Sequence, residues 1–359
     1  MSDAISALKI QALELLRQKI TIPSFSREEE RISEVFFQHL LSRDLSPERF
    51  LNNIWVKNKY FDPKKPTVLL NSHLDTVKPN AGYRLDPFAA TVRDGKLYGL
   101  GSNDAGGSVV ALLTAFIYFF DTPDLKYNII FAASAEEEIS GANGTEALLR
   151  HLKSIGIEPA FGIVGEPTGM QMAVAERGLL VLDCVAIGKS GHAARNEGDN
   201  AIYKAVEDIH WFKEFQFEQI SPLLGPNKMT VTVIQAGTQH NVVPPECRFT
   251  VDVRVNELYD FQAVLETIKS KVKSEVTPRS FRIKSTSIDL DHPLVKAGLS
   301  LGLTHYGSPT TSDKALMPFP ALKMGPGESA RSHTADEFIL VSEVEEGIDL
   351  YIEILKKVL

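Results

Sequence analysis

Short β-rich runs that alternate with helical segments and end in polar residues restrict the fold of this chain more than any other feature. TVLLN precedes Ser72 and His73, LYGLGSN precedes Asp104, YNIIFAASA precedes residues 136–138, and AFGIVG precedes Glu166. Strands that alternate with helices predict an open α/β sheet, whose ligands bind beyond the carboxyl ends of the strands. We therefore expect these polar clusters to lie at such ends.

The pattern changes at about residue 175. Three alternating, β-branched runs follow, GLLVLDCVAIGKSG, KMTVTVIQAG and ECRFTVDVRVNE, together with the helical stretches 201–215 and 258–276. These runs predict an inserted α+β domain at residues 175–286, with a four-stranded sheet and two helices. The remaining segments, 1–174 and 287–359, would form a discontinuous catalytic domain of the α/β class, with a mixed sheet flanked by helices.

Composition and charge favour a small-molecule ligand. The 359 residues carry a formal charge of −8 and no Lys/Arg tract, which argues against nucleic acid or an anionic membrane as the main partner. The apolar run at 109–120 is shorter than the ~20 residues that span a membrane. The N-terminal residues lack a signal-peptide pattern, and the two cysteines are far apart, so a cytoplasmic protein without disulfides is expected.

Five side chains that follow these strands and turns have the chemistry of a metal site. Each alone is more often a cap, a turn residue or a surface group, but imidazole and carboxylate groups together suit a borderline divalent cation such as zinc. A pair of metals would also explain why three consecutive glutamates, residues 136–138, end an apolar strand. The candidate ligands are His73, Asp104, Glu138, Glu166 and His333.

Five segments in this order give a resemblance to a known family. NSHLDTV, GLGSNDAGG, AEEEISGANG, GEPTG and SHTADE resemble motifs of the zinc-dependent acylase and peptidase superfamily. This superfamily contains acetylornithine deacetylase, succinyl-diaminopimelate desuccinylase, aminoacylase and glutamate carboxypeptidase. The resemblance extends over nearly the whole chain, including the insert.

The resemblance implies roles for individual residues. His73 and Glu166 would bind one zinc ion, Glu138 and His333 the other, and Asp104 would bridge the two. Glu137 would be the general base, and Asp75 would orient His73. The glycine turn after the glutamates favours residues 137 and 138, rather than 136 and 137, as the general base and the metal ligand. In the family, an acidic or bulky residue and a lysine often follow the aspartate that corresponds to Asp104, whereas this chain has Ala105 and Gly106. Because this difference could change the metal preference, Co²⁺ and Mn²⁺ are alternatives to Zn²⁺.

The resemblance also implies residues of the insert that would act on the substrate. KSGHAARNEGDNAI resembles the segment whose histidine reaches the active site of a partner subunit, so His192 would stabilise the oxyanion in a homodimer formed through the insert. The usual proline of that segment is absent here, and a capped surface turn is the alternative for His192. Asn241 and Arg254 would bind the substrate, with Arg177 and the backbone at Gly325 as weaker candidates; either arginine could instead be a surface charge.

These roles predict a metal-dependent hydrolase that removes an Nα-acyl group from an amino acid. N-acetylornithine, or an N-acylated citrulline, in arginine biosynthesis is the expected substrate. Within the same superfamily, succinyl-diaminopimelate desuccinylase and a dipeptidase are the alternatives. A catalytically inactive protein that binds amino-acid derivatives is the alternative from another class.

Overall fold

The chain forms two compact units. The computed structural model describes residues 2–359, with side chains described from Ala4 onward. The first unit contains the chain up to Val174 together with Ile288–Tyr306 and Ser312–Leu359, and the second contains Ala175–Ser287 and Gly307–Thr311. The sequence-based division placed residues 307–311 with the catalytic segments, whereas here they belong to the second unit.

A mixed sheet forms the centre of the first unit and confirms the predicted fold class. Its strands run in the order β1-β2-β6-β3-β7-β17-β8. β3 pairs in parallel with β6 and β7, and β7 with β17, whereas β2 and β8 are antiparallel to their neighbours. The strands are β1 (Glu48–Phe50), β2 (Asn53–Lys57), β3 (Thr67–His73), β6 (Asn128–Ser134), β7 (Pro159–Val164), β8 (Met172–Glu176) and β17 (Ala321–Lys323).

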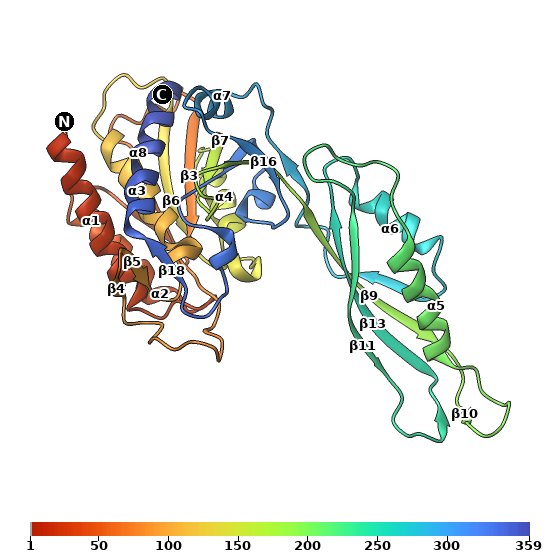
Figure 1. The fold of residues 1–359 in the computed structure, drawn as a ribbon. Helices are drawn as coiled ribbons and strands as arrows, with labels where there is room; N and C mark the ends of the chain where they lie inside the picture. Colours follow the sequence, from red (N-terminus) through yellow and green to blue (C-terminus); the bar gives the residue numbers. More distant parts are fainter. Residues whose placement is uncertain (1) are drawn as a thin grey trace. The chain divides into compact units, whose positions relative to one another are not determined.

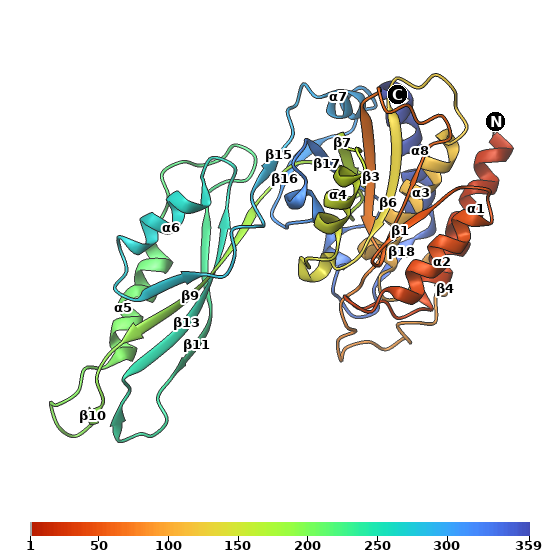
Figure 2. The same ribbon diagram turned by 180° about the vertical axis from the view of Figure 1, so that it is seen from behind.

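Helices cover both faces of this sheet. α3 (Gly107–Phe119) packs on β3 and β6, and α1 (Ser2–Ile20) and α8 (Val341–Val358) pack on α3, so these three helices lie on one side (Figure 1, Figure 2). α3 is apolar around nearly its whole surface and is buried accordingly. α4 (Thr145–Ser154) covers the other face, where Leu148 and Leu152 pack with Trp55, Leu69 and Ile130. The remaining helices of this unit are α2 (Glu30–Leu41) and α7 (Pro293–Ser300).

One strand lies outside the predicted sheet. The run LYGLGSN contains β5 (Lys96–Tyr98), which pairs with β4 (Thr91–Arg93) and β18 (Phe338–Leu340) in a separate three-stranded sheet. The prediction that this run ends at the carboxyl edge of the main sheet is therefore wrong. Asp104 is presented instead by an irregular turn over Ser102–Gly106, immediately before α3.

The second unit is an antiparallel sheet with two helices packed on it. The sheet has the order β11-β13-β9-β14, and Figure 1 shows α5 and α6 along one face of it. Its core includes Phe212 of α5, Leu265 of α6 and Val251 of β13. The elements are β9 (Gly178–Ile187), β10 (Gly191–His192), α5 (Ala201–Glu214), β11 (Lys228–Ala236), β12 (Val242–Val243), β13 (Glu246–Val255), α6 (Phe261–Lys269), β14 (Glu275–Pro278) and β15 (Thr286–Ser287). β8 and β16 (His305–Ser308) each span the boundary between the two units.

Candidate metal centre

The end of β3 presents His73 with one ring nitrogen already used. Nδ1 lies 2.9 Å from the backbone oxygen of Asp75 and 3.4 Å from Asp75 Oδ1, so it carries the proton and donates to these oxygens. Nε2 lies 3.2 Å from Asp104 Oδ1 and 3.9 Å from Glu166 Oε1. His73 is 1% exposed. The ring is therefore fixed with Nε2 aimed at two carboxylates, the arrangement of a metal-binding histidine.

The three consecutive glutamates separate into two roles. Glu136 has a left-handed backbone (φ 55°) and is buried, and its carboxylate accepts hydrogen bonds from the backbone and side chain of Asn143. It therefore holds the glycine turn that follows. Glu137 has a carboxylate oxygen within 4.8 Å of ligand atoms of His73 and Glu166, and Glu138 lies equally close to His73 and Asp104. The structure thus directs residues 137 and 138, and not 136, to the candidate site.

Asp75 supports this turn as well as the histidine. Its Oδ1 accepts the backbone N–H of Glu137 at 3.0 Å, and its Oδ2 accepts the backbone N–H of Glu138 at 3.1 Å and the hydroxyl of Ser26 at 2.7 Å. Asp75 is fully buried. One carboxylate therefore fixes the backbone of the proposed base and of the adjacent proposed ligand.

Glu337 holds the turn that carries Asp104. Its Oε1 accepts the backbone N–H groups of Asn103 and Asp104 at 2.8 and 2.9 Å, and its Oε2 accepts that of Gly101 at 3.1 Å. Asp104 itself has non-helical backbone angles, φ −114° and ψ 100°, inside this turn. The three hydrogen bonds pair backbone N–H groups of a turn that regular secondary structure leaves without such partners.

His333 completes the cluster from the C-terminal segment. Its Nε2 lies 2.9 Å from Glu138 Oε2 and 3.6 Å from Asp104 Oδ2. The two oxygens of Asp104 therefore face different histidines, Oδ1 towards His73 and Oδ2 towards His333. His333 has a positive φ of 60° and is about half exposed, whereas the other members of the cluster are buried or nearly so. This arrangement could hold two cations with Asp104 between them.

The electrostatics of the cluster fit bound cations. Burial raises the pKa of Glu166 to about 8, and burial together with the charge of Glu166 raises the pKa of Glu137 well above its ordinary value. The hydrogen bond to Glu138 raises the pKa of His333 to about 9. Glu166 Oε1 is buried and has no hydrogen-bond partner among the described residues. A divalent cation would stabilise these carboxylates in their charged form and engage that oxygen.

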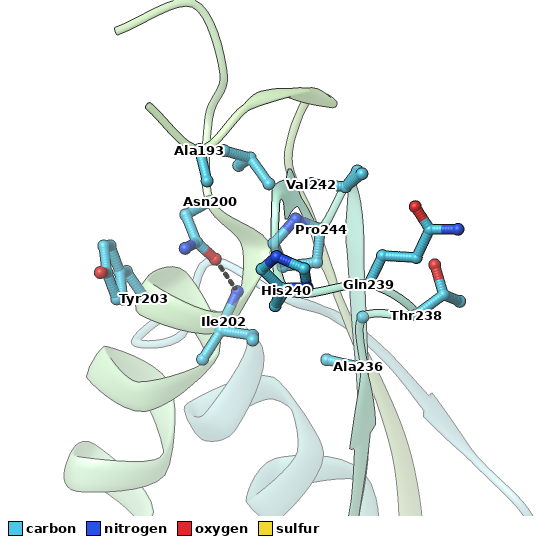
Figure 3. Close-up of a pocket in the computed structure, with 12 residues that line it drawn as sticks. Ala193, Asn200, Ile202, Tyr203, Ala236, Thr238, Gln239, His240, Val242 and Pro244 are labelled. Carbon is cyan, nitrogen blue, oxygen red and sulfur yellow. Dashed lines mark hydrogen bonds between the residues drawn. The ribbon is translucent and has the colours of Figure 1, made fainter. Parts of the chain in front are cut away.

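Of the five residues predicted to contact substrate, four lie in the second unit and Gly325 lies next to Glu166 in the first. His192 and Asn241 are neighbours in the second unit, where β10 pairs with β12 and the Ala193 N–H donates to the Asn241 carbonyl at 3.0 Å. A hollow of about 550 Å³ lies beside this ribbon, between the start of α5 and the loop before β12 (Figure 3). In the first unit, a Cβ at Gly325 would lie 2.6 Å from the Glu166 carbonyl, so the close approach requires glycine.

Both arginines have intramolecular partners within the second unit. The Arg254 guanidinium forms a bidentate pair with Asp252, at 2.8 and 3.0 Å. Arg177 donates through Nε and Nη2 to the Leu224 carbonyl. A carboxylate ligand would have to compete with Asp252 for the fork of Arg254. Their roles, like those of His192 and Asn241, remain predictions.

Several supporting residues were not identified from the sequence. The spacing of Ser26 and Glu29 in the sequence predicts a capping box, but Glu29 is itself the N-cap of α2 and makes no side-chain capping hydrogen bond. Ser26 binds Asp75, and Glu29 accepts the Glu136 N–H at 3.1 Å. Glu337 is the last residue of the SHTADE segment, and its place in that motif is the feature of the sequence that could have identified it. Asp313, buried behind the cluster, accepts hydrogen bonds from Asn71, Ser134 and Thr145.

Comparison with known proteins places the chain in a family. Residues 69–357 match the model of peptidase family M20/M25/M40. The chain is 24% identical to the succinyl-diaminopimelate desuccinylase of Vesicomyosocius okutanii, over 97% of this chain and 99% of the relative. It is 27% identical to a hydrolase of Sulfurisphaera tokodaii named for LysW-lysine and LysW-ornithine, over 99% and 98% of the chains. Among solved structures, the YXEP protein of Bacillus subtilis, described as a dinuclear metal-binding peptidase, superposes with a TM-score of 0.73 at 18% identity, over 98% of each chain.

The fold and the cluster of histidines and carboxylates define a metal-dependent hydrolase of amide bonds. The chain belongs to peptidase family M20/M25/M40, as its motifs predicted. For the substrate, the comparisons favour the alternative over the first expectation: relatives are named desuccinylases, and nothing in them supports N-acetylornithine or a place in arginine biosynthesis. No helix in residues 2–359 is both long and apolar enough to cross a bilayer.

Proposed function

We propose that this protein is a two-metal amidohydrolase that releases the amine of an amino acid from its N-succinyl group, with N-succinyl-diaminopimelate as the first candidate substrate. The near full-length match to a relative named succinyl-diaminopimelate desuccinylase carries the proposal. The cluster supports it chemically, because the carboxylate of Asp104 lies between two histidines and Glu137 lies at its border.

The proposed cofactor is a pair of zinc ions, with Co²⁺ and Mn²⁺ as alternatives. His73 and Glu166 would hold one ion, Glu138 and His333 the other, and Asp104 would contact both. When bound, the ions would polarise the amide carbonyl and make a nearby water more acidic. The mixed imidazole and carboxylate ligands suit zinc, and a cation at each histidine would also engage the buried carboxylates.

The side chains of this unit would then carry the proton transfers. Glu137 is the proposed general base: it would take the proton of the attacking water and give it to the leaving amine. Asp75 would hold Glu137 in place through the backbone hydrogen bond described above. In the second unit, His192 is proposed to donate a hydrogen bond to the tetrahedral oxyanion from a partner subunit, since its Nδ1 accepts the Ala194 N–H at 3.1 Å and leaves Nε2 as the donor.

A substrate panel tests the proposal. Purified protein with added zinc is incubated separately with N-succinyl-diaminopimelate, N-succinylornithine, N-succinylcitrulline, N-acetylornithine and dipeptides, and release of free amine is measured. We expect kcat/KM for a succinylated substrate to exceed that for its acetylated counterpart by at least about 100-fold, because a site built to bind the extra carboxylate rejects analogues without it. Hydrolysis of dipeptides alone, or equal rates for acetyl and succinyl substrates, would contradict the proposal.

A second candidate substrate follows from another comparison. The relative named for LysW-lysine and LysW-ornithine covers 99% of this chain. It favours lysine or ornithine, rather than diaminopimelate, as the amino acid that is released. Incubation with LysW-lysine and LysW-ornithine, the conjugates in that relative's name, distinguishes the two candidates. Turnover of either conjugate above that of the succinylated substrates would favour this candidate. Two bound metals without turnover of any substrate would instead support the non-catalytic binding protein.

A further inference from the structure

Lys19, near the end of α1, carries a buried amine beside the turn that leads to Asp104. Its side chain is 1% exposed, and its Nζ lies 3.5 Å from the carbonyl oxygen of Gly101. A Cβ added to Gly101 would lie 3.1 Å from that Nζ and 2.4 Å from a methyl carbon of Thr76. Gly101 also has a positive φ of 71°. The turn is therefore fitted closely around the amine, and glycine is required there.

A short hydrogen-bonded path links this amine to Asp104. Gly101, whose carbonyl faces Lys19, donates its N–H to Glu337 Oε2, and Glu337 Oε1 accepts the N–H of Asp104. Burial lowers the pKa of the Lys19 amine, and the charges of nearby carboxylates, Glu337 first, oppose that change. Removing an ammonium group from water is costly unless opposite charge surrounds it. Lys19 is thus positioned among acids.

The carboxyl groups of the centre favour a cation besides the metals. If all of them were ionised, their negative charge would exceed the positive charge of two divalent ions; they belong to Asp75, Asp104, Glu137, Glu138, Glu166 and Glu337. Like charges in a poorly hydrated region raise one another's energy. A fixed positive charge near them lowers that repulsion whether or not each metal position is filled.

We propose that Lys19 is an internal counter-ion of the metal centre, a positioning residue that offsets its carboxylates and holds the turn from Gly101 to Asp104. The inference rests on the proposed metal centre but not on the identity of the substrate. It has a thermodynamic consequence. Because the ammonium group repels cations as well as attracting the acids, removing its charge makes the centre bind zinc more tightly.

Zinc affinity, measured by competition with a chromogenic chelator, tests the inference. We expect Lys19→Met to bind zinc about tenfold or more tightly than the wild type, because one fixed positive charge no longer repels the ions. Lys19→Gln keeps a hydrogen-bond donor for Gly101 without the charge and should show the same gain. Lys19→Arg keeps the charge and should bind zinc like the wild type. Lys9→Met is the matched control on the same helix, since Lys9 pairs with Asp349 at 2.6 Å, and its zinc affinity should not change.

Unchanged or weaker zinc affinity in folded Lys19→Met and Lys19→Gln would overturn the inference. If neither neutral variant folds, the folding and zinc affinity of Lys19→Arg test the inference. A folded Lys19→Arg with the zinc affinity of the wild type would support a required positive charge, whereas failure of all three variants to fold would assign Lys19 to packing alone and overturn it. Wild-type protein that binds two zinc ions but leaves succinylated substrates intact would defeat the proposed function and leave this inference standing.

Discussion

At the residue scale, the division of the glutamate run decides which side chain can move a proton. Glu136 is held in the turn by Asn143, Glu138 is paired with His333, and Glu137 has no such pairing within the glycine turn. Its carboxylate lies close to His73 and Glu166, where burial raises its pKa. A base with a raised pKa holds a proton more readily between its two transfers.

The variant Glu137→Gln tests this assignment. We expect turnover to fall by about 10²–10⁴-fold or more, because the proton acceptor is lost while all five proposed ligands remain. Metal content, measured by inductively coupled plasma mass spectrometry, should equal that of the wild type. Loss of a metal ion from this variant would show that the ligand and the base have been exchanged. A variant with full activity would remove Glu137 from the mechanism.

The sequence identified the chemistry-bearing residues better than the residues that hold them. His73 and His333 belong to segments with recognisable motifs, and the structure brings them together around Asp104. Lys19, Ser26 and Glu337 act through partners far away in the chain, such as Asp75 for Ser26. A local pattern shows only near neighbours in sequence. Ser26 and Glu29 therefore looked like a helix cap, because tertiary hydrogen bonds leave no trace in spacing.

At the element scale, the turn after β6 depends on a residue that follows β3. Asp75 accepts the backbone N–H groups of Glu137 and Glu138, one with each oxygen. In Asp75→Asn, one oxygen becomes an NH₂ group that faces a backbone N–H. We expect zinc affinity to fall by about 10–100-fold, since the residues that orient metal ligands typically have effects of this size.

Ser26→Ala is the graded control for this variant. It removes one hydrogen bond to Asp75 and leaves both oxygens in place. Its effect on zinc affinity should be smaller than that of Asp75→Asn. Both affinities are obtained by chelator competition. Wild-type binding by Asp75→Asn would show that the turn keeps its shape without this carboxylate.

Helix α2 gives a pH dependence that is independent of the metal centre. Burial, with help from the charge of Arg43, lowers the pKa of His39 from 6.5 to about 4. Its Nε2 accepts a hydrogen bond from Arg43 Nε at 3.0 Å. Between these two pKa values the unfolded chain binds a proton that the folded chain does not, so stability is lost as the pH falls from 6.5 towards 4.

The variant His39→Gln measures this contribution. Its side-chain oxygen can still accept from Arg43 but cannot take up a proton. We expect the midpoint of urea unfolding to fall less between pH 7 and pH 5 in His39→Gln than in the wild type. Both proteins are measured with saturating zinc so that the metal centre contributes equally. Identical changes in the two midpoints would rule out His39 as a source of acid sensitivity.

Element boundaries were predicted less well than element types. The helical stretch expected at 258–276 ends in the structure at Lys269, and residues from Glu275 form β14 instead. Pairing of β14 with β9 supplies the competing hydrogen bonds, which helical periodicity cannot reveal. LYGLGSN was likewise read correctly as containing a strand but assigned to the wrong sheet, because strand partners far along the chain decide that assignment.

At the scale of the whole molecule, the second unit offers an edge for self-association. β11 is an edge strand of its sheet, and Val233 and Ile234 on it are 47% and 52% exposed. An exposed strand edge with apolar side chains readily pairs with another copy. This edge is one surface through which the predicted homodimer could form, and the action of His192 in the partner subunit stays a prediction.

Sedimentation velocity tests the dimer. We expect the wild type to sediment as a dimer at micromolar concentration and Ile234→Lys to shift towards the monomer, because a charge on the edge opposes pairing. Ile155→Lys replaces an equally exposed isoleucine, 48% exposed, in the first unit and should leave the dimer intact. A monomeric wild type would contradict both the dimer and the role of His192 in trans.

The order of the cluster along the chain has a consequence for biosynthesis. His73, Asp104, Glu138 and Glu166 all precede the second unit, whereas His333 follows it. A nascent polypeptide that has emerged through residue 287 therefore exposes most of the acidic donors without the second imidazole. All five proposed ligands are therefore present together only after residue 333 has been added, so the proposed pair of ions could be held only late in the synthesis of these residues.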